Sequence, residues 1–201
     1  MKKPIKFIYF DIGGVLLDWR GGYTRVAKKY GVSEESLYKV LERHWEKAAR
    51  GQLTGLGYMA EYAKILGLNP PFPSTSDFWS DHYAPIVETH ALVRELQSTY
   101  TLGLLSNAED GSMKYAMQKG LIPSISWHTI IDSSAVGVVK PEARIFELAE
   151  QASGVSPEEM LFIDDVEEYI AIVKSRGWQG MVFDTNNIAS SVKNIRDALG
   201  I

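Results

Sequence analysis

Five short, largely apolar runs are spread along the chain. Each is as long as a β-strand, and because successive residues are apolar, each is expected to be covered on both faces of a sheet. Apolar positions at helical spacing follow Glu142 and extend again from Ile188 to Leu199, so helices alternate with the later strands. This alternation predicts an α/β protein with a parallel sheet. The five runs are residues 7–10, 102–105, 127–131, 160–163 and 181–183.

Between the first two runs, apolar residues recur at helical spacing, which predicts an all-helical insertion at residues 19–86. One helix is expected to begin after Ser33, and a second is expected from Thr54 to Leu66, with Gly67 ending it. Half of the chain's 22 aromatic residues fall in this insertion, and we attribute them to the packing of its own helices. We therefore predict a core formed by residues 1–18 and 87–201 and a separate helical domain at 19–86.

A further helix start is expected at Ser156, because Pro157 and two glutamates follow it.

Composition excludes several classes of protein. The chain has 201 residues, of which 45% are hydrophobic and 23% charged, as is usual for a globular protein. Its net charge of -4 is not gathered in blocks, which argues against nucleic acid or an anionic membrane as partner. There is no cysteine, so disulfides and thiolate metal sites are excluded. No apolar run approaches the roughly 18 residues of a membrane span, and we expect a cytoplasmic monomer or homodimer.

Polar residues stand where the predicted strands end or where the next helix begins. Because ligands bind beyond the carboxyl ends of the strands in an open parallel sheet, these residues are candidates for one site. They are Asp11 after the first run, Ser106 and Asn107 after the second, Lys140 before the helix that follows Glu142, and Asp164 and Asp165 after the fourth run.

The residue types in this set indicate a metal and a phosphate ester. Three carboxylates at one sheet edge, from Asp11, Asp164 and Asp165, would repel one another unless a cation such as Mg²⁺ lay among them. Gly13 allows the backbone to approach closely, so its carbonyl is a candidate fourth ligand. Lys140, with the Ser106 hydroxyl and the Asn107 amide, would supply positive charge and donors to an anion. The expected partner is a small phosphorylated substrate.

In their order and spacing these segments resemble the motifs of the haloacid dehalogenase superfamily, above all residues 137–142 and 162–165. The resemblance implies a three-layer Rossmann-like core and a helical cap, inserted after the first motif, that closes over the site. It also implies that Asp11 is the nucleophile, that catalysis depends on Mg²⁺, and that an aspartyl enzyme intermediate forms. Asp165 would then be the more direct metal ligand, with Asp164 acting partly through water.

The chain departs from the family pattern at two positions. Family phosphatases usually carry a second aspartate, the general acid, where this chain has Gly13. The Asp-x-Gly-Gly sequence is nevertheless similar to that of some small phosphatases, including sugar phosphate phosphatases. We expect a preference for leaving groups that depart easily, unless Asp18, Tyr23 or His44 replaces the missing acid. An asparagine that often follows the acidic motif is Tyr169 here.

Three functions fit these residues. The favoured one is a Mg²⁺-dependent phosphatase in which Asp11 attacks phosphorus. The first alternative is a 2-haloacid dehalogenase, which uses the same nucleophile on carbon and needs no acid because halide leaves unprotonated. The second is a protein of this fold that binds a ligand without turning it over. The acidic pair Asp164-Asp165 favours a metal, and therefore the phosphatase.

Overall fold

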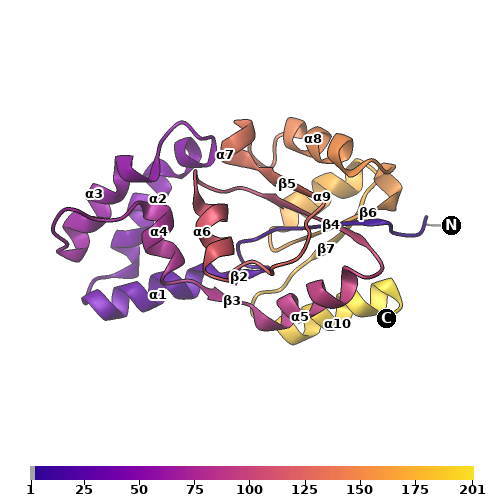
Figure 1. Ribbon diagram of the computed structural model, residues 1–201, viewed down its shortest axis with the longest axis horizontal. Helices are drawn as coiled ribbons and strands as arrows, with labels where there is room; N and C mark the ends of the chain where they lie inside the picture. Colours follow the sequence, from indigo (N-terminus) through magenta and orange to yellow (C-terminus); the bar gives the residue numbers. More distant parts are fainter. Residues whose placement is uncertain (1–2) are drawn as a thin grey trace.

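A five-stranded parallel sheet forms the centre of the protein, in a computed structural model that describes residues 3–201 (Figure 1). Its strand order is β5-β4-β1-β6-β7, which confirms the predicted α/β class with a parallel sheet. All of β1 and β6 is buried, as their unbroken apolar sequences predict. The strands are β1 (Phe7–Phe10), β4 (Thr101–Ser106), β5 (Thr129–Asp132), β6 (Met160–Asp164) and β7 (Gln179–Val182).

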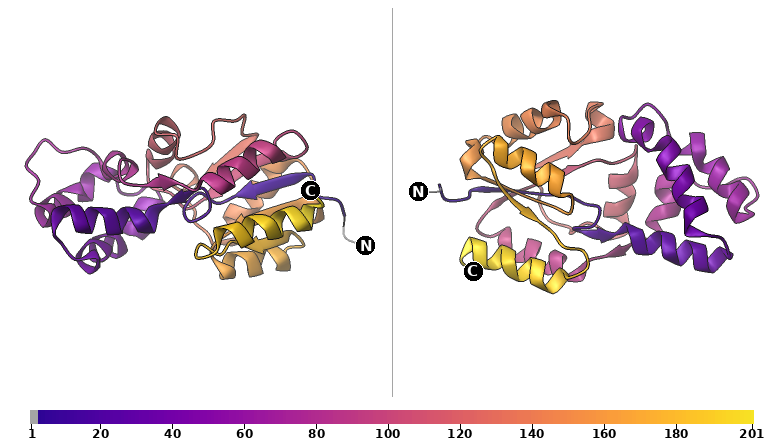
Figure 2. Two further views of the ribbon diagram at one scale, coloured as in Figure 1. Left: turned by 90° about the horizontal axis from the view of Figure 1, so that it is seen from below. Right: turned by 180° about the vertical axis from the view of Figure 1, so that it is seen from behind.

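Helices cover both faces of this sheet and complete a three-layer core (Figure 2). On one face Ile8 and Phe10 of β1 belong to an apolar cluster with side chains of α5, α6 and α10. On the other, Phe7 and Tyr9 pack with side chains of α8 and α9. These helices are α5 (Val87–Leu96), α6 (Ser112–Gln118), α8 (Ala143–Ser153), α9 (Glu167–Ser175) and α10 (Ile188–Leu199), and the short α7 (Ser133–Val136) follows β5.

The first four helices after β1 form what we call the helical unit, residues 19–80, at one end of the molecule (Figure 1). It has an apolar cluster of its own, in which Tyr23, Leu37 and Tyr62 are fully buried or nearly so. Helices were expected after Ser33 and up to Gly67, and both are confirmed. The boundaries of a separate domain stay a prediction. The helices are α1 (Trp19–Tyr30), α2 (Glu34–Ala49), α3 (Gly55–Leu66) and α4 (Thr75–Ser80).

The chain enters and leaves the helical unit through a two-stranded antiparallel ribbon of β2 (Leu17–Asp18) and β3 (Ala84–Pro85). A second link to the core lies near α7, where the Ser133 hydroxyl donates a hydrogen bond to the carbonyl of Ala49 at 2.7 Å. These contacts hold the helical unit beside the carboxyl end of the sheet, where the candidate residues lie.

The prediction of a helix beginning at Ser156 is wrong. Pro157–Glu159 form one turn of 3₁₀-helix, η1, and the chain then continues directly into β6. The turn has a complete capping box between Ser156 and Glu159, so the local signal is real. It ends after one turn because the apolar residues that follow are fully buried in the centre of the sheet.

No helix formed by residues 3–201 combines the length and the apolar character that crossing a membrane requires.

Two glycine substitutions test the packing of this fold. A Cβ atom at Gly103 in β4 would lie 2.7 Å from Cε1 of Tyr9 and 2.9 Å from Cε1 of Phe7, both in fully buried rings. We expect Gly103→Ala to lower the free energy of unfolding by about 1–3 kcal/mol, measured by urea denaturation. The control is Gly57→Ala in α3, where the Cβ would meet the flexible end of Leu53. Because alanine favours a helix over glycine, this variant should be at least as stable as wild type. Equal stability of Gly103→Ala and wild type would contradict the packing described.

Candidate active site

Three carboxylates meet at the carboxyl end of the sheet. Asp11 directly follows β1, Asp164 ends β6 and Asp165 comes next, and β1 and β6 are neighbours in the sheet. Each residue offers one oxygen, and these oxygens all lie within 4.8 Å of one another. Asp11 is buried and Asp164 is completely inaccessible to solvent. The structure therefore brings together the three acidic residues that were predicted from the strand ends.

The ammonium of Lys140 lies between two of these carboxylates. Its Nζ is 2.6 Å from Oδ2 of Asp164 and 3.0 Å from Oδ1 of Asp11, and it also donates a hydrogen bond to the carbonyl of Leu105 at 3.2 Å. The rings of Phe162 and Tyr169 each have their centres 5.1 Å from Nζ. Tyr169, the departure from the family pattern, thus offers an aromatic face to a buried cation.

Burial and charge act in opposite directions on these groups. Burial raises the pKa of Asp164 above its ordinary value, and the neighbouring Lys140 opposes this shift. Burial alone would lower the pKa of Lys140, but the charges of Asp11 and Asp164 outweigh it and raise that pKa above its usual range. Lys140 is therefore charged at neutral pH and compensates part of the negative charge around it.

Asp165 is held by a residue of the helical unit. Arg20, in the first turn of α1, places Nη1 2.9 Å from Oδ2 of Asp165, and its guanidinium lies 4.6 Å from the ring centre of Trp19. Burial raises the pKa of Asp165, and the hydrogen bond from Arg20 opposes that shift. The sequence analysis missed Arg20, because a single arginine at the start of a helix belongs to no recognisable motif.

The donor set fits a hard divalent cation such as Mg²⁺, whose preferred ligands are oxygens. Within residues 3–201, Oδ1 of Asp11 is buried and has no hydrogen-bond partner, since Lys140 approaches it outside hydrogen-bond geometry. The charged group beside it is the Lys140 ammonium, which Asp164 shares, so one positive charge faces two buried carboxylates and a further cation would help to balance them. Asp11, Asp164 and Asp165 are the residues that would hold it, and the carbonyl of Gly13 as a further ligand stays a prediction.

Ser106 ends β4, which pairs with β1 on the side opposite β6, and Asn107 follows it. Ser106 is buried and lines the pocket described below. The Asn107 side chain pairs with the backbone of Lys140: its Nδ2 donates to the carbonyl at 2.9 Å, and its Oδ1 accepts from the amide at 2.7 Å. Asn107 therefore holds the Lys140 segment in place, and a direct contact with an anion stays a prediction.

The turn after Asp11 leaves little room for a side chain at Gly13 or Gly14. Gly14 has φ of 83°, and a Cβ there would lie 2.5 Å from Oδ2 of Asp165, so a side chain would displace that carboxylate. A Cβ at Gly13 would lie 3.2 Å from Cδ1 of Trp19. The position where related phosphatases carry the general acid thus faces an indole ring.

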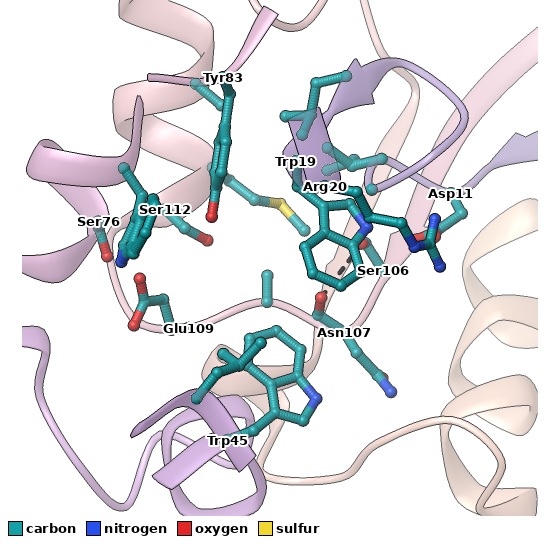
Figure 3. A pocket seen from close by; sticks show the side chains of 18 of the residues that line it. Asp11, Trp19, Arg20, Trp45, Ser76, Tyr83, Ser106, Asn107, Glu109 and Ser112 are labelled. Atoms are coloured by element: carbon teal, nitrogen blue, oxygen red, sulfur yellow. Dashed lines mark hydrogen bonds between the residues drawn. The ribbon is translucent and has the colours of Figure 1, made fainter. Parts of the chain in front are cut away.

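A pocket of about 360 Å³ lies between the sheet edge and the helical unit (Figure 3). Asp11 and Ser106 lie on one side of it, and Glu109 lies on the opposite side. The walls between them are mostly apolar. As expected, nearly all aromatic residues of the insertion pack within its own apolar cluster, but some of them also face this cavity. The aromatic lining consists of Trp19, Tyr23, Trp45, Trp79, Tyr83 and Tyr169.

The three candidate replacements for the missing acid have other partners. Asp18 accepts a hydrogen bond from the amide of Gly21 as the N-cap of α1. His44 lies 2.7 Å from a carboxylate oxygen of Glu61. Tyr23 does line the pocket, but its hydroxyl is paired with that of Tyr62 at 2.9 Å. Of the three, only Tyr23 is among the described residues that line this pocket.

Glu109 is a pocket residue that the sequence analysis missed. It follows Ser106 and Asn107 closely, so its position near a strand end was an available signal. Its Oε2 accepts hydrogen bonds from the hydroxyl of Tyr58 in α3 and from that of Thr75 in α4, the latter at 3.0 Å. Burial raises the pKa of Glu109 to about 8, and the charge of Asp110 adds to the shift.

With this geometry established, comparison with known proteins gives the family. A family model described as haloacid dehalogenase-like hydrolase matches residues 5–176. The chain belongs to this family of hydrolases. The resemblance inferred from the motifs is thereby confirmed at the level of the superfamily.

Two kinds of relative are similar to this member of the haloacid dehalogenase-like hydrolases. (S)-2-haloacid dehalogenase H-109 of Pseudomonas putida is 24% identical, over 97% of this chain and 95% of the relative. A HAD family enzyme of Bacteroides thetaiotaomicron, solved with magnesium and inorganic phosphate, has a TM-score of 0.70 at 20% identity, over 90% of this chain and 95% of that chain. L-2-haloacid dehalogenase of Xanthobacter autotrophicus has a TM-score of 0.62 at 24% identity, over 88% of this chain and 76% of that chain. At these identities the solved structures support the fold.

The raised pKa of Glu109 predicts a specific pH dependence of stability. In the unfolded chain a glutamate ionises near pH 4.5, whereas in the native protein Glu109 ionises near pH 8. Between these values the native state holds one proton more than the unfolded state, so the free energy of unfolding falls as pH rises. Glu109→Gln removes this effect. Between these pH values its free energy of unfolding should therefore rise relative to that of wild type by up to about 1.4 kcal/mol for each pH unit. Urea denaturation of both proteins at pH 5, 6, 7 and 8 measures the difference, and parallel profiles would contradict the shift.

Proposed function

We propose that this hydrolase is a Mg²⁺-dependent phosphatase acting on a small phosphate monoester through an aspartyl-phosphate intermediate. The observation that carries the proposal is the convergence of one oxygen each from Asp11, Asp164 and Asp165 within 4.8 Å, where the buried Oδ1 of Asp11 forms no hydrogen bond. The Asp-x-Gly-Gly sequence, which is similar to that of small phosphatases, supports it. The solved HAD family enzyme with magnesium and phosphate is consistent with it.

The residues at the sheet edge have distinct parts in this reaction. The Asp11 carboxylate attacks phosphorus in line, forming an oxygen–phosphorus bond while the bond to the leaving-group oxygen breaks. Lys140, whose Nζ lies 3.0 Å from Oδ1 of Asp11, and the Ser106 hydroxyl offset the charge that develops on the phosphoryl oxygens. Water then attacks phosphorus, releasing phosphate and restoring Asp11. When bound, Mg²⁺ would supply further positive charge for the phosphoryl group.

Hydrolysis of p-nitrophenyl phosphate tests the proposal. We expect activity with Mg²⁺, none with EDTA, and none in Asp11→Asn, because an amide cannot act as the nucleophile. The control is Asp197→Asn, which changes an exposed aspartate on α10 that pairs with Lys193 and should keep wild-type activity. Full activity in Asp11→Asn or in EDTA would contradict the mechanism.

The absence of an acidic side chain at Gly13 predicts how the rate depends on the leaving group. With Trp19 facing the position of the usual acid, the leaving oxygen departs without a proton donor there. General acid catalysis contributes about 10²- to 10⁴-fold, and its absence matters most for poor leaving groups. We expect kcat/KM for aryl phosphates to exceed that for primary alkyl phosphates by at least about 10²-fold. Similar values for p-nitrophenyl phosphate and a primary alkyl phosphate would show that another group protonates the leaving oxygen.

A 2-haloacid dehalogenase is the second candidate, because the curated relatives are dehalogenases and a halide needs no acid to leave. In that reaction Asp11 would attack carbon and form an ester, and no metal is required. Chloride release from 2-chloropropionate in the presence of EDTA, measured beside phosphate release, separates the two functions. Metal-independent chloride release would overturn the phosphatase proposal.

A further inference from the structure

The side of the pocket opposite Asp11 carries a carboxyl group that the proposed chemistry does not use (Figure 3). Glu109 comes from the core loop after β4, is 7% exposed, and lines the pocket. Tyr58 and Thr75 of the helical unit both donate to the same oxygen, Oε2. This arrangement fixes the orientation of the carboxyl group with respect to the cavity.

The other oxygen of Glu109 has no partner. Among residues 3–201 no group forms a hydrogen bond with Oε1, and this atom is not fully buried. Oε2 is engaged by two hydroxyl groups, whereas Oε1 has no protein partner, and burial raises the pKa of the group to about 8. Oε1 is therefore available to form a hydrogen bond with a ligand in the pocket.

Aromatic rings lie between this carboxyl group and the reaction centre. Figure 3 shows the indoles of Trp19 and Trp45 at the cavity between Asp11 and Glu109. Trp45 is 37% exposed although it is one of the largest apolar side chains. Two indoles beside a cavity favour a flat group that can stack on their faces.

We propose that Glu109 is a specificity-determining residue: its Oε1 forms a hydrogen bond with a hydroxyl group at the end of the leaving group remote from the phosphate. The leaving group is a substituted aryl group whose ring lies against Trp19 and Trp45. This inference rests on the proposed phosphatase function and names its substrate class. It agrees with the absence of an acid at Gly13, since aryl oxygens leave without protonation more readily than alkyl oxygens.

Two pairs of substrates of nearly equal size test the hydrogen bond. The first pair is 4-(hydroxymethyl)phenyl phosphate and 4-ethylphenyl phosphate, and the second carries the same groups at position 3. For at least one pair we expect wild type to prefer the hydroxymethyl ester by about 3- to 10-fold in kcat/KM, the effect of one hydrogen bond. Glu109→Leu should lose this preference, and Glu109→Gln, which keeps an N–H donor, should retain part of it.

Tyr58→Phe is the matched control. It removes a hydrogen bond to Oε2 and leaves Oε1 unchanged, so a loss of structural support alone would appear in this variant, and the preference should persist. Equal kcat/KM for both members of each pair in wild type, or an unchanged preference in Glu109→Leu, would overturn the inference while leaving the phosphatase proposal intact. No hydrolysis of the four esters by wild type that hydrolyses p-nitrophenyl phosphate with Mg²⁺ would overturn this inference alone, and no hydrolysis of any of the five esters would overturn both.

Discussion

The buried ammonium of Lys140 is the interaction on which the candidate site depends. Asp11 follows β1 and Asp164 ends the neighbouring strand β6, so the sheet brings their carboxylates together. Because both are buried, placing two negative charges there costs free energy. Lys140 lies within 3.0 Å of both and provides the compensating charge. With Asp165 and Arg20 included, three carboxylates face two cations, and the remaining negative charge is what a divalent cation would neutralise.

The two parts of the protein contribute differently to this site. The sheet edge supplies the charged groups, because parallel strands bring Asp11, Ser106 and Asp164 to one end. The helical unit supplies most of the aromatic wall of the pocket, and through Arg20 it also reaches the acidic cluster. Trp19 connects these roles, since its ring faces Gly13 as well as the cavity. Trp19 therefore both lines the pocket and faces the position at which related phosphatases carry the general acid.

The charged end of the site could be predicted from sequence because it depends on topology alone. Once residues 7–10 and 160–163 were assigned to parallel strands, the convergence of Asp11 and Asp164 followed. Arg20 could not be predicted, because its position depends on how the helical unit packs beside the core. Glu109 lies close to the end of β4, which was an available signal, but its contacts with Tyr58 and Thr75 depend on that packing. The ribbon of β2 and β3 was missed because two-residue strands have no periodicity to detect. At Ser156 the local capping signal was correct, but burial of β6 stopped the helix after one turn.

Binding of Mg²⁺ to the protein without substrate tests the central claim most directly, because it depends on the acidic cluster and on no assumption about the reaction. Isothermal titration calorimetry of wild type and Asp165→Asn, at equal ionic strength, makes the comparison. The account predicts saturable binding of one Mg²⁺ to wild type and a marked loss of affinity in Asp165→Asn. Absence of Mg²⁺ binding to wild type, or equal affinity in both proteins, would contradict it.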